Sequence, residues 1–214
     1  RVGGLQLLAE KAPSKQDPTG ATPDEQLTAV SRRAHRMLED QYSCFMQDLE
    51  RELARHQIIR LRADGLDDRQ AEKVREFFEN EIHAVMTPSV VYPGETFPLL
   101  VNRNLAACVE LRDRDRQGIS RFAVIPLGQT IGRIIQLPSD EGYAYILLED
   151  AVQMHVDRFF PGLTVADSAI FRITRNADLS VQEDSASDLL AGMEEVLNAR
   201  KRSDCVRLEI SSEA

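Results

Sequence analysis

The fold is set first by residues 22–56, which read TPDEQLTAVSRRAHRMLEDQYSCFMQDLERELARH. Thr22, Pro23 and Glu25 form an N-cap, a first-turn proline and a capping-box glutamate, which satisfy backbone N–H groups that lack a helical partner. Apolar residues then recur at steps of three and four, at Leu27, Val30, Ala34, Leu38, Tyr42, Phe45, Leu49 and Leu53. We therefore expect one long helix to about His56, whose apolar stripe must pack on this chain or on a partner.

A short strand and a second helix are predicted next. IIRLR, residues 58–62, is β-rich, and Gly65 interrupts it. Asp67 can cap a helix that runs to about Met86 and that Thr87-Pro88 ends. Its expected inner face consists of Ala71, Val74, Phe77, Phe78, Ile82 and Val85. The proline-rich segment TPSVVYPGETFPLLVN, residues 87–102, predicts an extended loop pinned by Phe97 and Leu99.

The hydrophobic period then changes to two, which favours strands. The strands are expected at Leu105–Arg112, Ser120–Ile125, Arg133–Leu137 and Tyr143–Leu148, followed by a helix over Glu149–Phe160, a strand around residues 169–175 and a third helix from Ser185–Asp188 to Arg200–Arg202. The sequence thus predicts an α+β fold, in which a long N-terminal helix precedes a mainly antiparallel sheet packed with helices.

Composition excludes some classes of function. Lys plus Arg is 26 against 35 for Asp plus Glu, a net charge of -9, so a generalised polyanion-binding surface and a nucleic-acid partner are not expected. Apolar runs such as YAYILL at 143–148 are too short to span a bilayer. The three separated cysteines, Cys44, Cys108 and Cys205, predict buried, reduced structural thiols in a cytoplasmic-type compartment. The abrupt ends suggest a segment of a longer protein.

No catalytic, cofactor-binding or metal-binding set emerges from the motifs. Glu79 and His83 lie one turn apart and could share a metal, but a third ligand is not evident, so a solvated helix face is favoured. His35, His56 and His155 are isolated, which is typical of surface or capping histidines. LGQTIGR, residues 127–133, lacks the P-loop lysine and is better interpreted as a turn.

One local cluster of cations surrounds the end of the long helix. Arg51, Arg55, Arg60 and Arg62 could meet a polyanion, although Glu50 and Glu52 among them favour an ordinary ion-paired surface.

A second pair of cations lies in FRITRNADLSV, residues 171–181. Strand alternation places Phe171 and Ile173 on one face and Arg172 on the other, whereas Arg175 needs a partner at the strand end, Asp178 being one candidate. Arg172 and Arg175 are interpreted either as structural ion pairs or as an interface with further domains.

Several of these segments, taken in order, resemble the long, multidomain bacterial polyphosphate kinases. They are RVGGL, TPDEQL, QIIRL, MTP, FPLLVN, ILLED followed by FFPG, and FRITRNADL followed by an acidic, DLL-containing helix. The resemblance covers essentially the whole chain. It implies that residues 1–56 end a helical N-domain, that residues 57–202 form a head domain used for dimerisation, and that residues 203–214 begin the strand leading to a catalytic half absent from this sequence.

The resemblance also implies an activity for the parent enzyme. Such enzymes use ATP and magnesium, and reversibly transfer the γ-phosphate of ATP to polyphosphate through a phosphohistidine in the catalytic half. This portion would hold no cofactor and would serve dimerisation and domain scaffolding. The parent is expected in the cytoplasm, with peripheral membrane association left open. Two alternatives remain: a stand-alone protein-interaction module using the long helix, and a small-molecule site at YPGETFPLLVN, residues 92–102.

Overall fold

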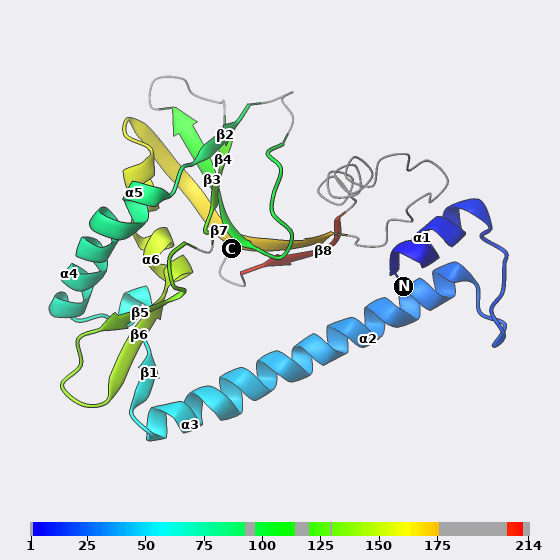
Figure 1. The fold of residues 1–214 in the computed structure, drawn as a ribbon, viewed down its shortest axis with the longest axis horizontal. Coiled ribbons are helices and arrows are strands. Elements are labelled where there is room, and N and C mark those ends of the chain that lie inside the picture. Colours follow the sequence, from blue (N-terminus) through cyan, green and yellow to red (C-terminus); the bar gives the residue numbers. More distant parts are fainter. Residues whose placement is uncertain (1, 93–96, 114–119, 129, 176–204, 212–214) are drawn as a thin grey trace, which may run out of the picture. The chain divides into compact units, whose positions relative to one another are not determined.

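The computed structural model describes residues 2–92, 97–113, 120–128, 130–175 and 205–211 (Figure 1). The chain divides into two compact units. The first unit comprises Arg1–Leu49 and Thr174–Arg207, and the second comprises Glu50–Ile173 and Leu208–Ala214. In the described ranges no helix is long and apolar enough to cross a membrane.

The first unit contains helix α1 (Val2–Lys11), helix α2 (Pro23–Ser43) and a π-helical turn, η1 (Cys44–Leu49). The predicted capping box begins α2: the Glu25 backbone N–H donates to Thr22 Oγ1 at 3.4 Å, and the Thr22 backbone N–H donates to Glu25 Oε2 at 2.8 Å. Helix α1 packs against α2. The start of the long helix is therefore fixed locally, as the sequence predicts.

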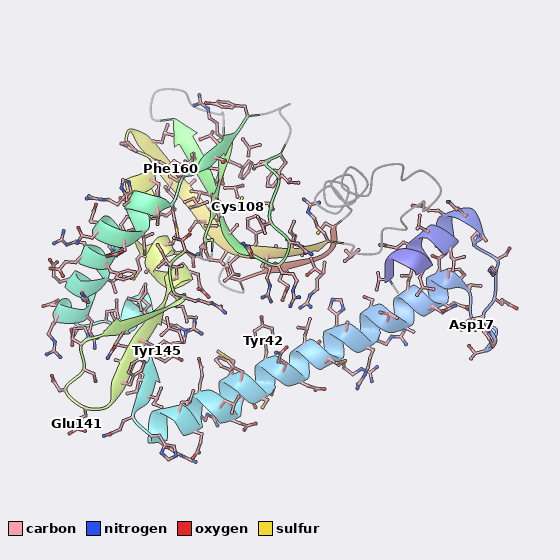
Figure 2. The ribbon with its side chains drawn as sticks, in the orientation of Figure 1. Asp17, Tyr42, Cys108, Glu141, Tyr145 and Phe160 are labelled. Atoms are coloured by element: carbon pink, nitrogen blue, oxygen red, sulfur yellow. The ribbon has the colours of Figure 1, made fainter. Side chains whose placement is uncertain are left out.

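Part of the apolar stripe of α2 is exposed in the described residues of the first unit. Pro23 is the one buried residue among those that the structure describes in this helix. Tyr42, in the middle of the stripe, is 59% exposed and projects from the helix in Figure 2. The helix has the predicted amphipathic pattern, and α1 packs on it, but Val30 and Tyr42 of the stripe stay exposed in the described part of the unit.

The second unit begins with helix α3 (Glu50–Arg55) and holds a small three-stranded sheet. Its order is β1-β6-β5, with β1 (Ile58–Arg60) parallel to β6 (Tyr143–Leu147) and β6 antiparallel to β5 (Ile134–Leu137). The parallel pair requires a long crossover, because two parallel strands cannot be joined by a hairpin. The chain between β1 and β6 supplies it.

A five-stranded antiparallel sheet has the order β2-β4-β3-β7-β8. Its strands are β2 (Ser89–Val91), β3 (Leu105–Asp113), β4 (Ser120–Pro126), β7 (Leu163–Arg175) and β8 (Cys205–Ile210). The register of β3 with β7 shifts between Glu110 and Leu111, which marks a β-bulge. The predicted loop thus includes a short edge strand, β2, and the predicted antiparallel sheet is confirmed.

Two helical segments pack in the second unit (Figure 1). The first runs through α4 (Asp68–Phe77), the π-helical η3 (Phe78–Ile82) and α5 (His83–Val85), and Asp67 and Gln70 form its capping box. The second comprises α6 (Leu148–Met154) and the 3₁₀ turn η4 (Val156–Phe159); another 3₁₀ turn, η2, spans Ala63–Gly65. Helix α6 contacts both β3 and η3, so it lies between the five-stranded sheet and the first segment.

The core of the second unit draws side chains from both sheets and both helical segments. Its fully buried members include Val74, Phe78, Ile82, Ala107, Val109, Ala123, Ile125, Ile146, Ala151 and Val152. Each element therefore contributes the apolar face that its own sequence period predicts.

Several expectations about individual side chains are wrong. Val85 is exposed rather than on the inner face of its helix, because the helix ends there. Phe97 and Leu99 are about half exposed and do not pin the loop. Cys44 lies on the exposed surface of the long helix and Cys205 begins an edge strand, so both are exposed, and Cys108 is half-buried. The predicted third helix, at 185–202, lies outside the described residues.

Candidate functional site

Arg172 lies on β7, opposite Leu105 of β3, and reaches across to the edge strand β8. Its guanidinium holds the carboxylate of Glu209 with two hydrogen bonds, from Nε at 2.9 Å and from Nη2 at 2.8 Å. The side chain of Glu209 is 19% exposed and that of Arg172 is 39% exposed. This two-point geometry ties β8 to β7 through side chains as well as through the backbone.

Arg175 is the last residue of β7 and is half-buried. The candidate partner Asp178 lies outside the described residues. Within the described range β7 extends to Arg175, and the predicted strand end at Asn176-Ala177-Asp178 lies outside the described residues.

Arg133 forms a second ion pair in the second unit. It holds Glu149 at the start of α6 in a two-point contact, with Nε 2.9 Å from one carboxylate oxygen and 3.1 Å from the other, and with Nη2 on the first oxygen. Glu149 is only 7% exposed. The hydrogen bond to Glu149 raises the pKa of Arg133, whereas partial burial and the positive charge of Arg172 lower it. Arg172 is therefore an electrostatic neighbour of Arg133.

Arg60, on β1, is the best-buried member of the predicted basic cluster. It donates to Asp150 of α6 at 3.2 Å and lies 3.6 Å from the carboxylate of Glu50. Burial raises the pKa of Asp150, while the hydrogen bond and charge of Arg60 lower it. Glu149 and Asp150 are adjacent at the beginning of α6. Each forms an ion pair with an arginine from another part of the same unit, Glu149 with Arg133 and Asp150 with Arg60.

The remaining cluster arginines are more exposed. Arg55 pairs with Glu52 at 2.8 Å, which His56 also approaches, and Arg51 and Arg62 lie at the surface. Arg62 lies close enough to Asp150 to influence the pKa of that carboxyl. The acidic side chains that alternate with these arginines compensate much of their charge, which is the ion-paired arrangement that the sequence favours over an open polyanion site.

No motif in the sequence pointed to Glu149, Asp150 or Arg133 as members of this network. The available signal was weak: ILLED places two acids directly after an apolar strand, and burial of such acids requires cationic partners. Which arginines would serve could not be read from the sequence, because the partners are 16 and 90 residues away.

Glu79 and His83, the candidate metal ligands, each contact another side chain. Glu79 accepts a hydrogen bond from Arg158, and the His83 ring packs on Phe159 with centroids 5.2 Å apart. Within the described ranges no three His, Cys, Asp or Glu residues are grouped to hold a metal ion. LGQTIGR leads into strand β5 and not into a helix, so it lacks the helix N-terminus that a P-loop uses.

Two family models match this chain. Residues 1–61 match the polyphosphate kinase N-terminal domain, and residues 69–214 match the polyphosphate kinase middle domain. The chain belongs to the polyphosphate kinase family, which confirms the resemblance read from its segments.

Relatives from distant bacteria match over nearly all of the chain. A polyphosphate kinase of Rhodopirellula baltica is 34% identical over 100% of this chain and 33% of its own length. A polyphosphate kinase of Pseudomonas aeruginosa is 37% identical over 98% of this chain and 31% of its own length. The chain therefore spans about a third of the relatives that it matches.

A solved structure supports the fold. The crystal structure of polyphosphate kinase from Porphyromonas gingivalis superposes with a TM-score of 0.72 over 92% of this chain and 30% of that chain, at 21% sequence identity. The α+β architecture described above is thus that of a known fold.

Proposed function

We propose that this chain is the non-catalytic N-terminal and head portion of an enzyme that reversibly transfers the γ-phosphate of ATP to polyphosphate, with magnesium, through a phosphohistidine outside this sequence. The observation that carries the proposal is the match of two consecutive family domains across the chain, which makes up about a third of its relatives. The ion pairs Arg133–Glu149, Arg60–Asp150 and Arg172–Glu209 support a scaffolding role, because each engages a carboxylate that is largely shielded from solvent.

The 214-residue chain is expected to form no polyphosphate from ATP and magnesium, even with a polyphosphate primer. Catalytic groups would lie in the part of the parent protein that it does not include. The measurement is incorporation of labelled γ-phosphate into acid-insoluble polymer, with the full-length P. aeruginosa polyphosphate kinase as positive control. ATP-dependent synthesis of polyphosphate by the purified chain would refute the proposal that this portion is non-catalytic.

We also propose that this portion self-associates, and that the stripe of α2 takes part. Leu38 and Tyr42 lie on the stripe, and Ala29 lies on the other side of the helix. A Tyr42→Glu change should lower the dimer fraction at least tenfold in sedimentation-velocity runs at tens of micromolar, because it places a charge in an apolar contact. Ala29→Glu adds the same charge away from the stripe and should leave association unchanged. A wild-type chain that stays monomeric at these concentrations contradicts the proposal.

Arg172 and Arg175 are proposed to face further domains of the full-length enzyme. In that enzyme, Arg172→Gln and Glu209→Gln each remove the same ion pair, at a cost of about 1 kcal/mol or less because the arginine is partly solvated. If Arg172 also contacts another domain, Arg172→Gln should lower kcat at least tenfold while Glu209→Gln has little effect. Equal activity losses in the two variants would reduce Arg172 to a structural role.

The stand-alone interaction module and the small-molecule site have less support. A module that acts alone does not account for consecutive matches to two domains of a longer family. The small-molecule hypothesis depended on a loop that encloses a ligand, and its Phe97 and Leu99 side chains are exposed. Polyanion binding by Arg51, Arg55, Arg60 and Arg62 stays a prediction, tested by polyphosphate titration of the chain.

A further inference from the structure

Four aromatic rings gather where the two helical segments of the second unit meet. Phe78 of η3 is fully buried, and its ring centroid lies 5.1 Å from that of His155 and 5.3 Å from that of Phe159. His83 of α5 completes the group, 6.0 Å from Phe78 and 5.2 Å from Phe159. This ring cluster, Phe78, His83, His155 and Phe159, joins the α4–α5 segment to the α6–η4 segment.

The position of His155 within the cluster is fixed by its backbone. Its N–H donates to the Val152 carbonyl at 3.3 Å, and its carbonyl accepts from the Arg158 N–H at 3.0 Å, so it links α6 to η4. The ring atom Nε2 is without solvent access and without a hydrogen-bond partner among the described residues. A neutral ring can leave only a lone pair at this atom, whereas a protonated ring must place an N–H there with no acceptor.

Charged groups from three elements face His155. They are Arg75 of α4, Glu79 of η3, and Asp157 and Arg158 of η4. Burial lowers the pKa of His155, the acids Asp157 and Glu79 raise it, and the two arginines lower it, with a net lowering. Glu79 and Arg158 are paired with each other, so together they place little net charge beside His155. The main reason that protonation is unfavourable is therefore the missing acceptor at Nε2.

We propose that the ring cluster is an acid-sensitive contact, in which protonation of His155 releases the α4–α5 segment from the α6–η4 segment. Protonation puts a charged donor at a buried atom that has no acceptor among the described residues, and the simplest relief is to move the imidazole out toward water. That movement separates the rings and uncovers the apolar face of η3. The proposal concerns stability and surface exposure, and it does not depend on the proposed kinase parentage.

The direction of the pH effect follows from linkage. The pKa of His155 is lower in the folded chain than in the unfolded chain, where it is about 6.5. Between those two values the unfolded or opened state binds more protons, so stability rises with pH in this window. The contact is at full strength above about pH 6.5 and weakens as pH falls toward the lowered value.

Amide hydrogen exchange between pH 7.5 and pH 5, corrected for intrinsic rates, tests the proposal. In the wild-type chain, protection in residues 78–82 and 156–160 should fall severalfold relative to β3 and β4, because protonation favours the opened state. His155→Phe keeps an aromatic ring without a titrating group and should abolish this difference. His83→Phe, in the same cluster but exposed, should retain it.

A second measurement keeps the test decisive if His155→Phe packs poorly. The imidazole NMR titration of the wild-type chain should place the midpoint of His155 below its ordinary value of about 6.5. A midpoint at or above the ordinary value, or a local loss of protection that persists in His155→Phe, would overturn the proposal. A loss abolished by His83→Phe would also overturn it, since it would assign the effect to the exposed ring.

Discussion

Phe78→Ala is expected to destabilise the second unit by about 4 kcal/mol. Phe78 is fully buried: none of its surface reaches solvent, and its ring contacts those of His155 and Phe159. Truncation removes the transfer free energy of the ring and leaves a cavity at the junction of the two helical segments, which the two sheets prevent from collapsing fully. Because the chain has no Trp, urea unfolding followed by far-UV circular dichroism is the suitable measurement.

Phe122→Ala is the matched control for that change. Phe122 lies on β4 and is 47% exposed, so the same atoms are removed from a half-solvated position. Its expected cost is about 1 kcal/mol, since only part of the apolar area is lost from the interior. Comparable losses in the two variants would show that the core centre has been placed wrongly.

Gly142→Ala is expected to cost about 3 kcal/mol, from positive-φ strain of about 1 kcal/mol and a steric overlap of about 2 kcal/mol. Gly142 has φ +71, and a Cβ built there would lie 2.2 Å from the Gln57 carbonyl oxygen. Gln57 cannot easily move, because its own φ is 59 and its carbonyl accepts the Tyr143 N–H at 2.7 Å. Relief of the overlap must therefore shift the start of the β1–β6 pair, Ile58 opposite Tyr143.

Gly162→Ala separates the two contributions. Gly162 has φ +85, but a Cβ there would meet nothing within 4 Å. It should cost only the conformational strain, about 1 kcal/mol. Far-UV unfolding of both variants, with amide exchange at Ile59 and Tyr145 as a local readout of the parallel pair, distinguishes the causes. Equal costs would mean that the contact with Gln57 adds nothing.

Local signals predicted the elements of this protein well. Thr22 with Glu25 and Asp67 with its Gln70 partner begin their helices as capping boxes, since a cap requires only residues three apart. Alternating hydrophobicity located β3 and β4 because the inward side chains of a strand recur every second residue. A π-helical segment in each long helix was not anticipated, because no propensity signal marks it.

Exposure of individual side chains was predicted less well. Cys44 and Phe97 belong to residue types that are usually buried, yet both are exposed. Residue type gives only a preference for burial, and the neighbours that would cover a side chain come from distant parts of the chain. The ion pairs of Arg133 and Arg60 could not be predicted for the same reason, because their acidic partners at the beginning of α6 are distant in the sequence.

The sequence by itself determined most of the helices and strands, the α+β class and the family, because caps, hydrophobic periods and ordered segments are local properties of the chain. Tertiary structure alone decided that β1 pairs in parallel with β6, that Arg172 meets Glu209, and that an isolated histidine, His155, lies against the buried Phe78. These contacts join residues that are far apart in the sequence. Which residues meet depends on how the sheets and helices pack, and a local sequence pattern does not contain that information.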